Sequence, residues 1–331
     1  MGDPSGIGPE IILKAIFSKH AKNAARMVVI GYPEPFVRDA GLLNLDIKIR
    51  KIDSPHEVTE EENTLHLIVP AKSIDIPLRY GILDKSCGHA AALCIELSAK
   101  LAMNGEIDAV VTAPINKESL NMAGYNYPGH TEFYQQLTGA ENTAMMLTLG
   151  NFRVIHVVTH IPIRDVPDMI KKERIVKVAT LMHDVLLRLG IKRPGLAVSG
   201  LNPHAGESGL FGKEELEEII PAVDKLKEAD IDVTGPLPPD TVFARAYNGE
   251  FDGVVAMFHD QGHIALKLAG FKFAEGSREI GGVNTTLGMP IIRTSVDHGT
   301  AFDIAGKGIA SHLSMIEAVE MAAKLVRGNF H

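Results

Sequence analysis

The stretch RVIHVVTHIPIRDVPDMIKKERIVKVATLMHDVLLRLGIKRPGLAVSG, residues 153–200, decides the fold class. It opens with Arg153–Thr159, a short apolar run without polar alternation, which is typical of a strand buried on both faces. Apolar residues then recur at helical spacing over Glu173–Leu189, and Gly195–Ser199 is a second apolar run. A strand, a helix and a strand in this order indicate an α/β protein with a parallel sheet.

The same alternation continues outward along the chain. Further strands are expected at Met27–Gly31, Leu65–Val69, Asp108–Thr112 and Gly253–Phe258. Further helices are expected at Glu10–Lys19, Gly88–Asn104, Lys213–Glu228 and His312–Val326. A chain of 331 residues is long enough for two domains. The sequence therefore predicts two α/β domains with mostly parallel sheets.

The composition is that of an ordinary globular protein and argues against several classes of function. Hydrophobic residues make up 45% and charged residues 22% of the chain. The net charge of -8 argues against a nucleic-acid partner, and no apolar run approaches the length of about 18 residues that indicates a membrane span. The N-terminus lacks the pattern of a signal peptide, and the two cysteines, Cys87 and Cys94, are spaced as core positions of a helix. We expect a cytoplasmic protein.

Histidines follow three of the expected strands at the points where these strands end. They are His160, His204 in the string LNPHA, and His259. Ligands of open α/β sheets bind beyond the carboxyl ends of the strands, and a neutral imidazole is a common metal ligand. One such histidine alone is most often an ordinary loop residue, but three in corresponding places make a metal site about as probable as not. His130, before a short helix, stands out in the same way.

Two other motifs each allow more than one structural interpretation. The string HDQGH at 259–263 resembles the HExxH helix of zinc proteases, but Gly262 disfavours a helix and a strand is expected to run straight into it. We therefore expect a loop there. The glycine-rich Gly2–Glu10 matches neither a dinucleotide fingerprint nor a P-loop. A substrate-binding loop and a plain tight turn are equally consistent with it.

The segment His298–Ala310 resembles the HGSAPDIAGKGIA segment of isocitrate and isopropylmalate dehydrogenases. In those enzymes this loop holds the adenosine side of a nicotinamide cofactor without a Rossmann fold. The resemblance implies that the cofactor is NAD. It also implies cofactor contacts from Gly299, Ala301, Asp303, Ile304 and Ala305.

The chain as a whole resembles the 4-hydroxythreonine-4-phosphate dehydrogenase family. The matching strings are GDPSGIGPE at 2–10, TAPINK at 112–117, GHTE at 129–132, THIPIRDV at 159–166, LNPHAGE at 201–207, GPLPPDT at 235–241, HDQG at 259–262 and RTSVDHGTA at 293–301. The resemblance implies an isocitrate/isopropylmalate dehydrogenase-like fold, not a Rossmann fold. Its domains would comprise residues 1–128 with about 288–331, and about 129–287.

Residue roles follow from this resemblance, not from spacing. One divalent metal ion (Zn, Mg, Mn or Co) would bind to His160, His204 and His259. Substrate contacts would come from His130, Thr131, Lys267, Asn284 and Arg293. Family members are homodimers whose active site is shared between the subunits.

Two residues have open roles. Lys267 suits proton transfer, and it suits equally well a fixed cation for phosphate or carboxylate. Asp240 could orient a ligand or accept a proton, but the cap of the following helix is slightly favoured.

The resemblance also implies the reaction: oxidation of the C3 hydroxyl of a 4-phosphorylated four-carbon acid, followed by decarboxylation of the 3-oxo acid. Family members in the vitamin pathway are shorter around Phe271–Gly282, whereas the branch acting on 4-phospho-D-threonate or 4-phospho-D-erythronate has a similar insertion. We expect such a sugar acid as substrate, with 4-phosphohydroxy-L-threonine as the alternative.

Other classes remain open, namely a metal-dependent hydrolase and a non-catalytic metabolite sensor. Relatives usually begin with a short strand before the GDPSG loop. We expect its absence from this sequence to lower stability.

Overall fold

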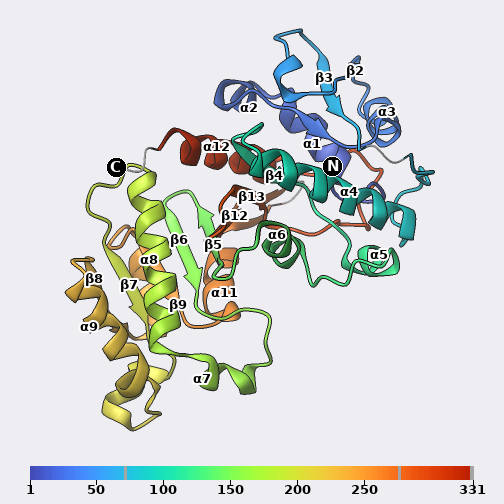
Figure 1. The fold of residues 1–331 in the computed structure, drawn as a ribbon. Coiled ribbons are helices and arrows are strands. Elements are labelled where there is room, and N and C mark those ends of the chain that lie inside the picture. The colour runs from blue at the N-terminus through green and yellow to red at the C-terminus, as the bar shows by residue number, and fades with distance from the viewer. Residues whose placement is uncertain (71–72, 275–276, 329–331) are drawn as a thin grey trace. The chain divides into compact units, whose positions relative to one another are not determined.

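The computed structural model describes residues 1–70, 73–274 and 277–328 of the chain (Figure 1). Its contacts divide the chain into two compact units. The first comprises Met1–Glu141 with Met289–Val326, and the second comprises Asn142–Gly288 with the residues from Arg327 onward. None of the helices in the described ranges has the length and apolar character needed to cross a membrane.

The first unit has a small parallel sheet and, outside that sheet, a pair of parallel strands. The small sheet has the order β1 (Val29–Ile30), β3 (Thr64–Ile68), β2 (Lys48–Lys51), and the pair joins β4 (Ala109–Thr112) to β13 (Ile292–Val296). The helices are α1 (Gly8–Ile16), α2 (Lys19–Ala24), α3 (Pro33–Leu42), α4 (Lys85–Met103), α5 (Lys117–Met122), α6 (His130–Thr138) and α12 (Leu313–Arg327), with a 3₁₀ turn at Pro55–Glu57.

The second unit is built on a mixed sheet. Its strand order is β12 (Val283–Leu287), β5 (Ala144–Leu149), β6 (Phe152–His156), β9 (Gly253–Ala256), β7 (Leu196–Ser199), β8 (Val233–Leu237). The pairs β12–β5 and β5–β6 are antiparallel, and the remaining pairs are parallel. The helices are α7 (Val166–Met169), α8 (Lys172–Arg188), α9 (Ile220–Glu228), α10 (Pro239–Tyr247) and α11 (His259–Gly270). Shorter elements are the turns Ile163–Asp165, Pro203–Gly209 and Glu215–Ile219, and the hairpin of β10 (Phe271–Ala274) and β11 (Ser277–Ile280).

Helices cover both faces of this second sheet, which explains its unbroken apolar strands. On one face lies α8: a Cβ added to Gly253 would meet the side chain of Met182. On the other face, Val254 belongs to a buried cluster with Val242 of α10 and Leu266 of α11. The alternation of strand side chains therefore sends one set towards α8 and the other towards α10 and α11.

The predicted α/β class with mostly parallel sheets is confirmed. Each predicted strand and helix has a counterpart in the structure. Several short elements were not predicted, among them α3, α5, β2 and β12. The exposed pattern of β2 carries Lys48, Arg50 and Lys51 around a single Ile49, which leaves no apolar run to detect.

One prediction is wrong: the chain at His259 is a helix, not a loop. The helix α11 begins at His259 and continues to Gly270. The argument against it relied on the low helix propensity of Gly262, which is worth only about 1 kcal/mol. Only glycine fits at this position, because a Cβ at residue 262 would lie 2.4 Å from Nε2 of His156 and 2.6 Å from Cγ1 of Val154. Close helix–sheet packing therefore overrides the propensity.

Candidate functional site

One face of α11 carries three polar side chains of the candidate site. His259, His263 and Lys267 are spaced four residues apart, so they lie above one another along the helix. The imidazoles of His259 and His263 stack with centroids 3.7 Å apart and an interplanar angle of 14°. Sequence analysis singled out His259 and Lys267. It considered His263 only as the second histidine of an HExxH-like string and set that interpretation aside, because no helix was expected there.

Further histidines from the β6 region join this stripe. The His156 ring, at the end of β6, lies 4.7 Å from that of His263, and the His160 ring lies 5.8 Å from that of His259, both measured between centroids. His156 was not predicted because it interrupts an apolar strand and looks like a core residue. The structure does bury it, with 1% of the side chain exposed.

Burial keeps the two inner histidines neutral. It lowers the pKa of His156 to about 3, helped by the neighbouring His263. Burial, and then His259, lower the pKa of His263 to about 4. Nδ1 of His263 lies 3.0 Å from the carbonyl oxygen of His259 and must be the donor, since a carbonyl only accepts. His156 and His263 are therefore uncharged at neutral pH, the state in which imidazole binds metals.

His259 has the hydrogen bonding of a metal-binding histidine. Its Nδ1 lies 2.7 Å from a carboxylate oxygen of Asp260 and donates to it, which leaves Nε2 as the free nitrogen. Carboxylates commonly orient metal-ligating histidines in this way. The spacing of 5.8 Å between the His160 and His259 rings is compatible with two imidazoles on one ion, because each nitrogen would lie about 2 Å from it.

His204 is borne on a separate turn after β7. Its side chain is exposed, and its ring is 6.2 Å from that of Phe211. Within the described ranges, no group of three or more histidine, cysteine or acidic side chains has the arrangement of a metal site. The structure thus brings His160 and His259 together, but it does not group His204 with them. Gln261 joins the two segments, since its Oε1 accepts from the N–H of Met257 and its Nε2 donates to the carbonyl of Gly200.

The remaining predicted residue of the second unit is Asn284 on β12. Its partner across the strand pair is Leu147 of β5, and its Nδ2 lies 3.0 Å from Sδ of Met145. Met145 also presents its carbonyl oxygen to His156, 3.3 Å from Nδ1. Asn284 is therefore connected through Met145 to the histidine cluster.

In the first unit, Arg293 of β13 is a buried cation. It is 3% exposed, and it donates to Oγ1 of Thr112 on β4 at 2.7 Å. Burial lowers the pKa of Arg293 to about 10, while Tyr134 and Glu132 act in the opposite direction. A buried cation is costly unless anions approach it, and Glu132 is such an anion in the surroundings of Arg293.

His130 lies in the electrostatic reach of this arginine. Burial, and then the charge of Arg293, hold the pKa of His130 well below its ordinary value, so that it is a neutral donor. His130 and Thr131 form the first residues of α6, where free backbone N–H groups also favour anions. The structure thus places His130 in the electrostatic surroundings of Arg293.

The predicted cofactor loop is firmly anchored within the first unit. The N–H of Ile304 and that of Ala305 both donate to the carbonyl of Ala301, and all three side chains pack against a core cluster around Ile7 and Met315. Lys14 donates to the carbonyls of Gly308 and Ala310, which fixes the end of the loop. Gly299 and Asp303 are exposed. An exposed carboxylate on a rigid loop suits the hydroxyls of a ribose.

The glycine-rich start of the chain is a packing element. Residues 2–10 are all buried. A Cβ at Gly6 would lie 2.9 Å from the Thr300 side chain, and a Cβ at Gly2 would lie 2.4 Å from the carbonyl oxygen of Pro114. These contacts favour the tight-turn interpretation over a substrate-binding loop.

Two further interpretations are corrected or delimited. Asp240 is not the cap of α10, because Pro238 occupies the N-cap position and no side-chain cap hydrogen bond is present. Asp240 lies in the first helical turn and is exposed.

The insertion Phe271–Gly282 forms the β10–β11 hairpin, in which Phe271 pairs with Ile280. Residues 275 and 276 of this insertion lie outside the described residues.

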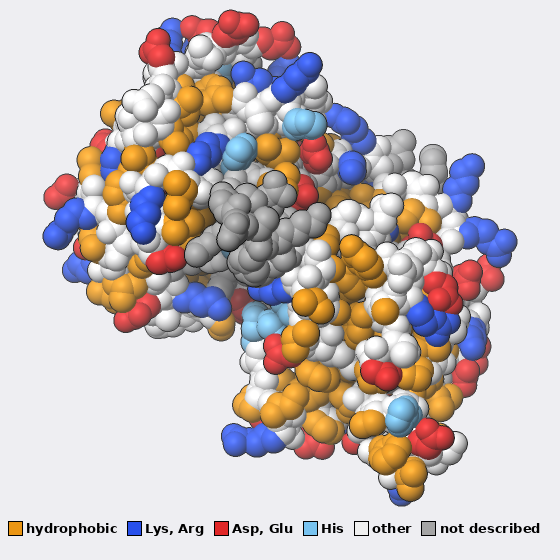
Figure 2. Space-filling model, turned by 180° about the vertical axis from the view of Figure 1, so that it is seen from behind, with side chains coloured by type: hydrophobic (Ala, Val, Ile, Leu, Met, Phe, Trp, Pro, Cys, Tyr) orange, Lys and Arg blue, Asp and Glu red, His pale blue; other side chains and the backbone are white. Residues whose placement is uncertain are grey.

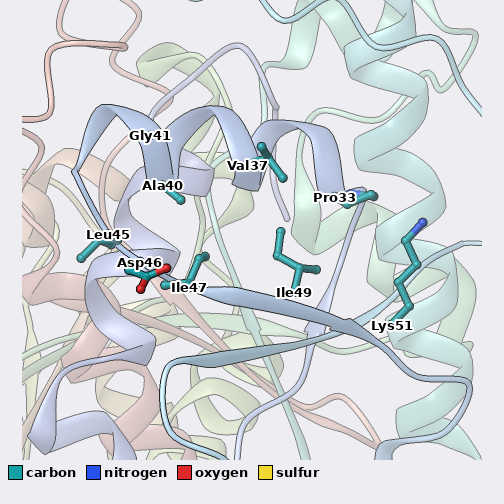
Figure 3. A pocket seen from close by; sticks show the side chains of 9 residues that line it. All are labelled: Pro33, Val37, Ala40, Gly41, Leu45, Asp46, Ile47, Ile49 and Lys51. Carbon is teal, nitrogen blue, oxygen red and sulfur yellow. The ribbon is translucent and has the colours of Figure 1, made fainter.

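A pocket of about 480 Å³ lies in the first unit between α3 and β2 (Figure 3). Val37 and Ala40 line it from the helix, Ile49 lines it from the strand, and Asp46 and Lys51 stand near its ends. None of the predicted site residues contributes to it. On the face shown in Figure 2, acidic and basic side chains are interspersed.

Comparison with known proteins identifies the family. Residues 23–322 match the family described as pyridoxal phosphate biosynthetic protein PdxA. The chain is 44% identical to the D-threonate 4-phosphate dehydrogenase of Pectobacterium atrosepticum, covering 98% of this chain and 97% of the relative. It is 45% identical to the enzyme of the same name from Cupriavidus necator, covering 98% and 95%.

Solved structures agree. A 4-hydroxythreonine-4-phosphate dehydrogenase from Klebsiella pneumoniae superposes with a TM-score of 0.84 at 43% identity, covering 99% of this chain and 98% of the other. The relatives named here are dehydrogenases. This chain is accordingly an oxidoreductase that acts on a CH–OH group, and it belongs to the PdxA family.

Proposed function

We propose that the chain oxidises the C3 hydroxyl of 4-phospho-D-threonate or 4-phospho-D-erythronate with NAD and a divalent metal ion, and that the 3-oxo acid then loses carbon dioxide. The observation that carries this proposal is one face of α11, which bears His259, His263 and Lys267. His160 lies beside this face, near His259. The names of the relatives support a phosphorylated four-carbon acid.

The phosphate is assigned to the first unit. Arg293 would bind it in bidentate fashion, and His130 and Thr131 would donate hydrogen bonds to it. Thr112, whose Oγ1 accepts a hydrogen bond from Arg293, would help to orient the guanidinium towards the phosphate.

The metal is assigned to the second unit. His160, His204 and His259 would hold it, and when bound it would supply Lewis-acid stabilisation of negative charge on the C3 oxygen. Lys267 would take the proton of the C3 hydroxyl or hold an anionic group of the substrate, and Asn284 would orient the substrate. Gly299, Ala301, Asp303, Ile304 and Ala305 would hold NAD, the acceptor of the hydride.

A second candidate substrate is 4-phosphohydroxy-L-threonine, because the Klebsiella pneumoniae relative carries the corresponding name. Phosphate and metal contacts are common to both candidates, so these contacts do not separate them.

The test combines chelation with one substitution. NADH formation from 4-phospho-D-threonate should disappear after EDTA treatment, return with Mn²⁺ or Zn²⁺, and be absent from His204→Ala with the fold intact by circular dichroism. Full activity in EDTA together with full activity of His204→Ala would refute the metal assignment.

A further inference from the structure

Glu215 is a buried carboxylate outside every predicted site. It is 1% exposed, and it begins a π-helical turn, Glu215–Ile219, that leads into α9. Its Oε1 accepts from the backbone N–H of Leu201 at 2.8 Å and of Asn202 at 2.7 Å. Its Oε2 accepts from Nδ2 of Asn202 at 2.8 Å. One carboxylate therefore holds the start of the turn that carries His204.

That turn has a backbone conformation that needs such support. Six successive residues, 204–209, have positive φ angles, from 45° at Glu207 to 93° at Gly209. A non-glycine residue in the left-handed region is strained, because its Cβ comes too close to the following carbonyl oxygen. Such a run persists only where its surroundings determine it.

The backbone of the turn that carries His204 packs closely against the carboxylate of Glu215. A Cβ at Gly206 would lie 2.7 Å from Oε2 of Glu215, and a Cβ at Gly200 would lie 3.2 Å from Oε1. The extra residue of a π turn changes the direction of the side chain at its start, and such turns often occur at functional sites. Through Gln261, Gly200 is also tied to the first turn of α11, which carries His259.

We propose that Glu215 is a positioning residue that presents His204 to the metal ion. The inference rests on the proposed function, in which His204 is a ligand. By fixing the backbone of the turn in the metal-free protein, Glu215 removes an ordering cost that metal binding would otherwise carry.

The experiment titrates the metal-free full-length protein with Co²⁺, followed by its visible absorption, and measures amide exchange over residues 200–212. Glu215→Ala should raise the Kd for Co²⁺ by about 10- to 100-fold, as loss of a supporting group around a metal site does. It should also speed exchange at Leu201 and Asn202. Glu215→Gln keeps an acceptor for these N–H groups but turns a donor towards Asn202, so its Kd should be intermediate.

Glu217→Ala is the matched control, because Glu217 is an exposed carboxylate on the same π turn. It should leave the Kd and the exchange unchanged. Two results overturn the inference: Glu215→Ala and Glu215→Gln with the wild-type Kd, or a loss of affinity equally large in Glu217→Ala. His204→Ala separates the two claims. If it weakens Co²⁺ binding while Glu215 variants do not, only the inference fails; if it binds Co²⁺ as the wild type does, the metal assignment fails.

Discussion

At the scale of single residues, burial decides which side chains are charged. Asp3 in the N-terminal turn is fully buried, and its Oδ1 accepts from the N–H of Ser5. Burial raises the pKa of Asp3 to about 6, against the opposing effect of that hydrogen bond. The folded state therefore binds a proton more tightly than the unfolded chain does. Its contribution to stability is present below about pH 3.8 and is lost as the pH rises through about 6.

Asp3→Asn should remove this pH dependence, because asparagine imitates the protonated carboxyl. We expect the variant to melt at a higher temperature than the wild type at pH 7.5 and at a similar temperature at pH 4. Thermal melts between pH 4 and 8 provide the measurement. A variant that melts lower than the wild type at every pH would show that the carboxylate is needed as an acceptor.

Arg293 should act on the phosphate in particular. Its replacement by glutamine removes charge-assisted hydrogen bonds worth about 1.5–3 kcal/mol, or roughly 10- to 150-fold in kcat/KM. The loss should be large for the phosphorylated substrate and small for the same acid without phosphate. Equal losses for both acids would assign Arg293 a structural role. Thr112→Val, which removes only the Oγ1 acceptor of Arg293, should cost less than Arg293→Gln.

Sequence reasoning at this scale succeeded where chemistry and position coincided. His160 and His259 were found at strand ends and do lie together. His156 was missed, because a histidine inside an apolar run has no distinctive local pattern. His263 was set aside, because the helix that places it beside His259 was not expected. Glu215 was missed for another reason: its role depends on contacts with residues 201 and 202 across a loop, which only the folded chain creates.

At the scale of elements, two helical glycines test the packing of α11. A Cβ at Gly262 would collide with His156 and Val154, whereas a Cβ at Gly41 of α3 would meet nothing within 4 Å. Gly41→Ala should stabilise by about 0.5–1 kcal/mol, the gain in helix propensity. Gly262→Ala should destabilise by about 1–3 kcal/mol, since a well-packed interior resists added volume.

Urea unfolding of the two variants makes the comparison. Because both substitutions are chemically identical, a difference in sign isolates the close approach of α11 to β6. Stabilisation by Gly262→Ala as large as that by Gly41→Ala would contradict the packing described here.

The alternation of strands and helices could be predicted because buried parallel strands are uniformly apolar. The antiparallel strand β12 was missed because VNTTL mixes polar and apolar residues. The helix α11 was predicted as a loop because propensity was weighed without the partner that makes Gly262 necessary.

At the scale of the whole molecule, we expect a homodimer. This prediction comes from the family resemblance, and two exposed apolar side chains on α11 agree with it: Ile264 is 67% and Leu268 is 82% exposed in the single chain. Sedimentation at micromolar concentration should give twice the chain mass of 35.8 kDa. Leu268→Glu should shift the equilibrium towards monomer and lower activity. A fully active monomer would contradict the prediction.

The central claim is the identity of the substrate, and one comparison tests it most directly. The kcat/KM values for 4-phospho-D-threonate and 4-phosphohydroxy-L-threonine are measured with NAD and Mn²⁺ by absorbance of the reduced nicotinamide. The two substrates differ at C2, hydroxyl against ammonium, and a site built to hydrogen-bond one group rejects the other. We predict a preference for the sugar acid of at least about tenfold, or 1.4 kcal/mol. An equal or higher value for the amino acid would contradict the account.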